Sequence, residues 1–190
     1  FIEANPRLQV EHTVTEEVLG VDLVRAQLAV ASGATLASLG LSQATIPSPR
    51  GFAMQLRVNM ETMDEKGVTK PTGGTLSVFD LPSGPGVRVD TFGYSGYRTS
   101  AAFDSLLAKV IVHSSSPKWA DIVHKAARTL RDFRIGGFAT NNPFLGAGLA
   151  QRGVLRKHIT TNFVDAPVAA LRRSGNQHPE PRCAVQGGGA

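Results

Sequence analysis

The spacing of hydrophobic and polar residues along this chain predicts a mixture of strands and helices. In residues 51–61 the two kinds alternate, which predicts a strand with Met54, Leu56 and Val58 on its buried side. Shorter apolar runs bounded by glycine, proline or polar residues predict further strands. These runs cover residues 75–79, 87–90, 106–113 and 160–164. The middle of the chain is therefore predicted to be rich in strands.

Three segments have hydrophobic residues at helical spacing. They cover residues 21–31, 116–133 and 142–150. Ser116-Pro117 and Asn142-Pro143 begin the second and third, because Ser or Asn favours the N-cap and Pro favours the first turn. The glycine pair at 136–137 is predicted to stop the second helix.

Composition divides the chain into three parts. Residues 32–50 are rich in Gly, Ser, Thr and Pro and are predicted to connect two structural units. After residue 165 the chain turns to Pro, Gly, Arg and small polar residues, which predicts a disordered tail. We therefore expect domains over residues 1–46 and 47–165, followed by a tail over 166–190.

The amino end has a second alternating pattern, in which every odd-numbered residue from 3 to 11 is polar. Because side chains of an extended segment alternate between faces, these five are predicted to share one side of a strand. They are Glu3, Asn5, Arg7, Gln9 and Glu11. Carboxylate and amide oxygens suit Mg²⁺, and a guanidinium suits a planar anion. By pattern alone, an active-site strand and a solvated edge strand remain equal alternatives.

Composition excludes some classes of function. The net charge of +5 and pI of about 9.8 invite a nucleic-acid interpretation, but the basic residues are scattered and no aromatic residues are interleaved with them. No apolar run approaches the roughly 18 residues of a membrane span. The single cysteine, Cys183, cannot form an internal disulfide. Anionic small-molecule substrates explain the mild basic excess equally well, and we expect no nucleic-acid partner and no membrane. A chain that opens without Met, inside a motif, is interpreted as part of a longer protein.

Four ordered motifs resemble the biotin carboxylase family. Glu3-x-Asn5-Pro6-Arg7, followed by Gln9-Val10-Glu11-His12, is similar to the closing signature of its ATP-grasp domain. Three later stretches resemble the same family in the expected order. They are Gln55-Leu56-Arg57-Val58-Asn59-Met60-Glu61, Phe103-Asp104-Ser105-Leu106-Leu107-Ala108-Lys109 and Phe133-Arg134-Ile135-Gly136-Gly137-Phe138-Ala139-Thr140-Asn141. The resemblance implies an α+β fold: the end of an ATP-grasp domain, then a biotin carboxylase C-terminal domain with mainly antiparallel sheet and flanking helices.

The same resemblance implies roles for the polar residues of the first motif. Glu3 and Asn5 match metal ligands that hold Mg²⁺ or Mn²⁺ against the phosphates of ATP. Arg7, Gln9 and Val10 match the residues that bind bicarbonate.

Two further residues match the family's chemistry. Glu11 matches the general base that removes the bicarbonate proton. Arg57 matches the arginine that orients bicarbonate and stabilises the biotin enolate, and Arg7 completes the implied catalytic set.

The resemblance also implies partners and a location. The complete reaction would use ATP, bicarbonate and biotin on a carrier domain, with a carboxyltransferase component and homodimer formation, in the cytoplasm or the mitochondrial matrix. No glycine-rich phosphate loop occurs between residues 1 and 165, so we expect the isolated chain to be inactive without the N-terminal part of the enzyme. The alternative is a non-catalytic interaction or dimerisation module. The final carboxyl acceptor, pyruvate or an acyl-CoA, is not determined by this sequence.

Overall fold

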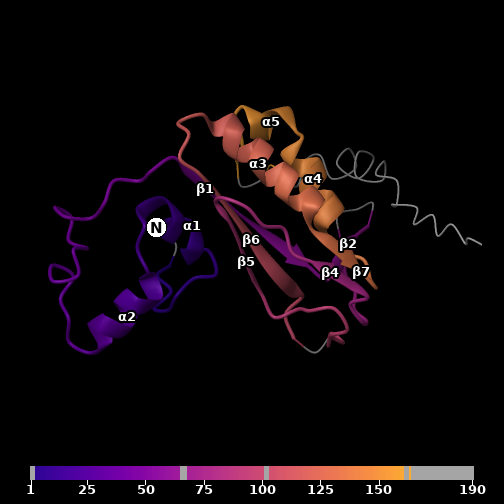
Figure 1. Cartoon of the computed structure of the whole chain (residues 1–190), viewed down its shortest axis with the longest axis horizontal. Helices are drawn as coiled ribbons and strands as arrows, with labels where there is room; N and C mark the ends of the chain where they lie inside the picture. Colours follow the sequence, from indigo (N-terminus) through magenta and orange to yellow (C-terminus); the bar gives the residue numbers. More distant parts are fainter. Residues whose placement is uncertain (1–2, 65–67, 101–102, 161–162, 164–190) are drawn as a thin grey trace, which may run out of the picture.

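The computed structural model describes residues 3–64, 68–100, 103–160 and 163, and its helices and strands are shown in Figure 1. In chain order they are α1 (His12–Leu19), α2 (Leu23–Ala31), β1 (Phe52–Asn59), β2 (Glu61–Met63), β3 (Thr69–Pro71), β4 (Val78–Asp80), β5 (Val87–Thr91), β6 (Leu106–Ser114), α3 (Trp119–Asp132), β7 (Arg134–Gly136), α4 (Asn142–Leu149) and α5 (Arg152–Leu155). The predicted strand over 160–164 falls largely outside the described residues, and the predicted tail falls wholly outside them.

An antiparallel sheet with strand order β1–β6–β5 forms the centre of the described chain. The pairs β2–β3 and β4–β7 are also antiparallel. Helices α3, α4 and α5 lie together on one side of this sheet, and α1 and α2 lie apart from them (Figure 1). The predicted α+β class with antiparallel strands is therefore confirmed.

One face of the central sheet carries the hydrophobic core. Leu56 and Val58 of β1 and Val110 of β6 are buried in one cluster with Ile122 and Leu130 of α3. The alternation that predicts a strand over 51–61 is therefore confirmed, because its apolar positions meet the apolar face of α3.

Helix α1 meets the opposite face of the sheet, which we call the α1 face. Five side chains lie on it in register across β1, β6 and β5. They are Gln55, Arg57, Lys109, Arg88 and Asp90. Contacts of α1 with β1 and β6 place this short helix over the face. The polar and charged residues of the sheet therefore lie on the α1 face, where the buried Ile111 of β6 lies across from Gln55 and Arg88.

The strand predicted for the amino end is wrong. Residues 3–9 have no regular secondary structure, and α1 begins at His12. The Arg7 N–H donates to the Asn5 carbonyl, 2.8 Å away, which closes a tight turn centred on Pro6. The fixed φ of proline suits the middle of such a turn, and the turn breaks the alternation that would have kept the five polar side chains on one side.

Other boundaries shift for local reasons. The helix predicted over 21–31 is α2, and the Asp22 side chain caps it by accepting from the Arg25 N–H at 2.8 Å. The helix predicted over 116–133 begins at Trp119, with Lys118 rather than Ser116 at the N-cap. It ends at Asp132, before the glycine pair, because residues 134–136 form β7 against β4. Helices α1 and α5 were not predicted. Among the described residues, no helix is both long and apolar enough to cross a bilayer.

Candidate functional site

The ion pair between Glu11 and Arg57 brings two predicted site residues together. Arg57 points from β1 onto the α1 face, and Glu11 is the residue that precedes α1. The Arg57 guanidinium donates to the Glu11 carboxylate across 46 positions of sequence. Both side chains are about half exposed, at 45% for Arg57 and 57% for Glu11. A small anion in solvent can therefore reach a cation beside a candidate proton acceptor.

A buried hydrogen bond fixes α1 beside this pair. Thr13, in the first turn of α1, is completely buried, and its hydroxyl donates to the Gln55 Oε1 at 2.6 Å. Gln55 lies two residues before Arg57 on the same side of β1. The start of α1, and with it Glu11, is thereby held at the Arg57 end of the strand.

A charge network fixes the other end of α1. Arg88 donates to Glu16 of α1 at 2.9 Å and makes two bonds to Asp90 at 2.8 and 3.1 Å. Lys109 Nζ lies 3.0 Å from the second oxygen of Asp90. Glu16 also accepts from the Leu23 N–H at 2.9 Å, so the network reaches the start of α2. These bonds join the helical amino region to β5 and β6.

The network shifts the pKa values of two of its members. Burial opposes ionisation of Asp90, but hydrogen bonds from Arg88 and Lys109 outweigh it, so the pKa of Asp90 lies below its ordinary value. The hydrogen bond to Asp90, with a further bond to Glu16, raises the pKa of Arg88. Asp90 is therefore an anchoring carboxylate and not a proton carrier at neutral pH.

Glu3 and Asn5 lie together at the exposed amino end. The Asn5 side-chain amide donates to the Glu3 Oε1 at 3.3 Å. The part of the chain that the structure describes holds no group of three or more His, Cys, Asp or Glu that could hold a metal ion. Mg²⁺ commonly uses one or two protein carboxylates and completes its shell with water and substrate phosphates. The donor chemistry of Glu3 and Asn5 fits such a site.

Arg7, Gln9 and Val10 occupy the turn between this end and α1. Arg7 is exposed, and its guanidinium donates to the Leu8 carbonyl at 3.5 Å. The Gln9 carbonyl accepts from the N–H and from Nδ1 of His12, at 3.2 and 2.7 Å. Since a carbonyl only accepts, His12 Nδ1 carries a proton. Among the described residues, the structure joins Glu11 to Arg57, while the Arg7 guanidinium forms no hydrogen bond or ion pair with either of them.

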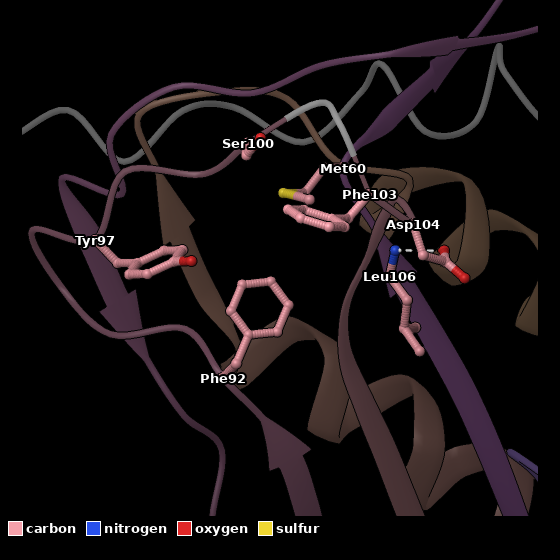
Figure 2. Close-up of a pocket in the computed structure, with 7 residues that line it drawn as sticks. All are labelled: Met60, Phe92, Tyr97, Ser100, Phe103, Asp104 and Leu106. Carbon is pink, nitrogen blue, oxygen red and sulfur yellow. Dashed lines mark hydrogen bonds between the residues drawn. The ribbon is translucent and has the colours of Figure 1, made fainter.

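A separate cavity of about 350 Å³ lies near the end of β1. Figure 2 shows the rings of Phe92, Tyr97 and Phe103 around it, and the Leu106 N–H donating to Asp104 at 3.0 Å on its rim. Phe103 is 83% exposed. None of the residues that line the cavity belongs to the predicted site, so the cavity adds no group to the Glu11–Arg57 pair.

Sequence reasoning missed the residues that support the pair. The Thr13–Gln55 bond joins residues 42 positions apart, and no local pattern predicts it. Asn141 contacts the backbone of Arg57; the sequence placed it at the end of the fourth family motif and gave it no role in the site.

Residues 55–166 match the family described as Biotin carboxylase C-terminal domain. The chain belongs to this family. Residues 1–39 match a second family, described as Carbamoyl-phosphate synthase L chain, ATP binding domain. The recognition as the C-terminal portion of a biotin carboxylase is therefore confirmed, while the predicted domain boundaries stay predictions.

Curated relatives of this biotin carboxylase C-terminal domain are pyruvate carboxylases. The chain is 41% identical to pyruvate carboxylase of Aspergillus terreus over 179 residues, which cover 94% of the chain and 15% of that protein. It is 44% identical to pyruvate carboxylase 1 of Caenorhabditis elegans over 166 residues, covering 87% of the chain and 14% of the relative. The chain thus spans about 15% of the curated relatives it matches.

Solved structures of biotin carboxylase domains are also similar to this chain. The biotin carboxylase domain of a single-chain bacterial carboxylase aligns with a TM-score of 0.83 and 44% identity, covering 93% of this chain and 39% of that one. The biotin carboxylase domain dimer of Hydrogenobacter thermophilus 2-oxoglutarate carboxylase aligns with a TM-score of 0.80 and 33% identity, covering 90% and 36%. That structure is described as a complex with MgADP, ADP and bicarbonate.

Proposed function

We propose that this chain supplies the bicarbonate-activating end of a biotin carboxylase, which carboxylates carrier-bound biotin with ATP and bicarbonate. The observation that carries the proposal is the ion pair between Glu11 and Arg57. Its two members come from the two matched families, one in residues 1–39 and one in residues 55–166. The bicarbonate described in a 33% identical structure supports the choice of anion.

In this proposal Glu11 and Arg57 act on the same anion. Bicarbonate binds the Arg57 guanidinium through its oxygens, and the Glu11 carboxylate accepts its proton. The oxygen so exposed attacks the γ-phosphorus of ATP, and ADP leaves as carboxyphosphate forms. Arg57 would also stabilise negative charge on the ureido oxygen of carrier-bound biotin, because a cation held in place favours a developing anion. Arg7, Gln9 and Val10 complete the proposed bicarbonate site.

Glu3 and Asn5 would hold the metal ion of this site through a carboxylate and an amide oxygen. Mg²⁺ or Mn²⁺ bound there would neutralise phosphate charge during phosphoryl transfer.

This proposal predicts weak Mn²⁺ binding to the chain, measured by paramagnetic relaxation of water protons. Glu3→Ala should abolish that binding and Glu17→Ala should preserve it, and equal binding by the two variants would remove Glu3 from the site.

The complete reaction needs partners. We propose that the N-terminal part of the ATP-grasp domain supplies the phosphate loop, that a carrier domain presents biotin and that a carboxyltransferase uses the product. A second copy of the domain, as in the dimer described for the 2-oxoglutarate carboxylase, is part of the same proposal. The location is the cytoplasm or the mitochondrial matrix, and one relative is named as a mitochondrial pyruvate carboxylase of Mus musculus.

Complementation tests this function. The chain is mixed with the N-terminal ATP-grasp portion of a related biotin carboxylase, and bicarbonate- and biotin-dependent release of ADP is measured. Each part alone should be inactive, and the mixture should be active. Arg57→Ala and Glu11→Gln should each remove activity while the circular dichroism spectrum stays unchanged.

Arg134→Ala is the matched control for this test. Arg134 also forms an ion pair with a carboxylate, Asp80, and both side chains are 60% exposed. Its loss should leave activity unchanged. Turnover by the chain alone would refute the need for a partner portion. Equal activity of the Arg57 and Arg134 variants would refute the proposed site and favour the alternative of a non-catalytic interaction module.

A further inference from the structure

At the outer edge of β1, the backbone groups of Arg57 and Asn59 are hydrogen-bonded by one residue from a distant part of the chain, Asn141. Because β1 is an edge strand of its sheet, its outward backbone groups need partners beyond the sheet. The Asn141 amide donates from Nδ2 to the Arg57 carbonyl at 3.1 Å. Its Oδ1 accepts from the Asn59 N–H at 2.8 Å. The Asn141 N–H donates to the Asn59 carbonyl at 3.1 Å.

These bonds require an asparagine in one orientation. The Asn59 N–H can only donate and the Arg57 carbonyl can only accept, so Oδ1 and Nδ2 of Asn141 cannot exchange places. Asn141 precedes α4, where an asparagine side chain ordinarily caps its own helix. Here it makes no such cap bond. The Asn141 side chain bonds to the backbone of β1 instead, and these bonds connect the start of α4 to the strand that carries Arg57.

The three bonds of Asn141 to Arg57 and Asn59, which we call the Asn141 clamp, lie where the pairing of β1 with β6 is irregular. The pairing of β1 with β6 shifts register between Val58 and Asn59, and such a bulge locally disrupts the ladder. The Arg57 side chain is 45% exposed, so packing does little to fix its direction. That direction depends on the backbone at Arg57 and on the ion pair with Glu11.

We propose that Asn141 is a positioning residue for Arg57: by holding the Arg57 carbonyl and the Asn59 N–H, it keeps the guanidinium at Glu11, where bicarbonate binds. The bicarbonate part of this inference rests on the proposed function. The clamp itself does not, so the two are tested separately.

Side-chain NMR of the chain tests the clamp without any assay of activity. The heteronuclear NOE of the Arg57 Nε–H should report an ordered side chain. Asn141→Asp places an acceptor against the Arg57 carbonyl, and Asn141→Ala removes both side-chain bonds without adding charge. Both variants should lower the NOE of Arg57 toward that of an exposed arginine.

Asn142→Asp is the matched control, one residue away. The Asn142 side chain donates to the Leu130 carbonyl of α3 at 3.2 Å, so this variant loses a comparable bond to a different element. It should leave the Arg57 NOE unchanged. If Arg57 keeps its NOE in both Asn141 variants, or loses it equally in Asn142→Asp, the inference is overturned. In the unaltered chain, the Asn59 amide should exchange slowly with solvent, and fast exchange would also overturn it.

The complementation assay then tests the consequence for the anion. Asn141→Ala should raise KM for bicarbonate several-fold while KM for ATP changes little. In an Arg57→Lys background, which retains a cation at this position, the same change should have a smaller effect. An equal rise in both KM values, or a full effect in that background, would refute positioning through Arg57. If Arg57→Ala itself leaves turnover intact, the proposed function fails and the NMR result alone decides the clamp.

Discussion

Asp90 is the residue that holds the charged side chains of the α1 face together. Its two oxygens accept from Arg88 and Lys109, and Arg88 reaches on to Glu16 of α1. Arg88 thus links Asp90 and Lys109 to α1. Removing the Asp90 carboxylate would leave the Arg88 and Lys109 cations side by side. Asp90 is therefore the carboxylate that holds these two cations together on the α1 face.

Asp90 predicts acid sensitivity. Because its pKa in the folded chain is below the ordinary value of 3.8, the folded state binds its proton less readily than the unfolded state does. Its stabilisation is complete above that ordinary value and is lost as the pH falls through the lower folded-state value. Asp90→Asn should cost about 1–2 kcal/mol of unfolding free energy at pH 7 and progressively less as the pH falls below the ordinary value. Urea unfolding of the unaltered chain and of Asp90→Asn across this pH range measures the difference in unfolding free energy. A difference that does not change with pH would contradict the predicted role of Asp90.

Gly137 gives a second prediction for a single residue. It has φ +111°, and a Cβ built on it would lie 1.9 Å from the Thr75 carbonyl oxygen. Gly137→Ala should therefore lower the free energy of unfolding by about 2–4 kcal/mol, through both the clash and the backbone strain. Gly96 also has positive φ, at +91°, but no atom within 4 Å of that Cβ. Gly96→Ala should cost only about 1 kcal/mol, and equal costs in thermal unfolding would contradict the clash.

At the scale of elements, α3 supplies the side chains that cover the core face. Ile122, Val123, Ala126 and Leu130 recur at helical spacing and are all buried. They pack on β1 and β6, whose apolar residues alternate with polar ones. Each element buries one apolar face at this interface, so the spacing of its own apolar residues was enough to predict it from the sequence.

Ile122 tests this interface. Ile122→Ala removes a side chain with no exposed surface, so it should lower the free energy of unfolding by about 2–5 kcal/mol. His124→Ala, on the exposed side of the same helix, should change it by less than about 0.5 kcal/mol. Chemical denaturation of both variants measures the difference. A similar cost for the two would show that α3 does not pack on the sheet as described.

At the scale of the whole molecule, the chain has a well-packed part and a lightly anchored part. The core lies between α3 and the sheet. Helix α2 has no buried residue, and large apolar side chains such as Leu28 are exposed, at 65%. The amino region is held to the sheet through α1, by the Thr13–Gln55 bond and by the ion pairs of Glu11 and Glu16. Helix α2 is therefore the lightly anchored element of this region.

This difference predicts the order of local opening. Amides of α2 should exchange hydrogen early, because opening this helix exposes little additional apolar surface. Amides of α3 and β6 should exchange last, near the free energy of global unfolding. Hydrogen exchange followed by mass spectrometry or NMR gives the order directly. Protection of α2 equal to that of α3 would contradict the light anchoring of α2.

Much of the sheet and of α3 could be predicted because their signals are local. The alternation in residues 51–61 and the helical spacing in 116–133 both describe one buried face. The same alternation misled at the amino end, where the odd-numbered positions are polar but no sheet partner pairs with residues 3–9 in the described structure. Pro6 closes a turn there instead. Periodicity indicates a strand reliably only when one of its faces is buried.

The family motifs, the strand and helix segments with one buried face, and the residue types of the candidate site could all be read from the sequence, because each is encoded in short spacings. The antiparallel arrangement of the strands was implied only by the family resemblance. Only the folded chain shows that Glu11 pairs with Arg57, that Arg7 forms no bond with either, and that Asn141 bonds the backbone of β1 at Arg57 and Asn59. These contacts join residues 46 and 84 positions apart. Such contacts form only when α1 and α4 dock on the sheet, and docking is set by packing of the whole chain rather than by any local preference.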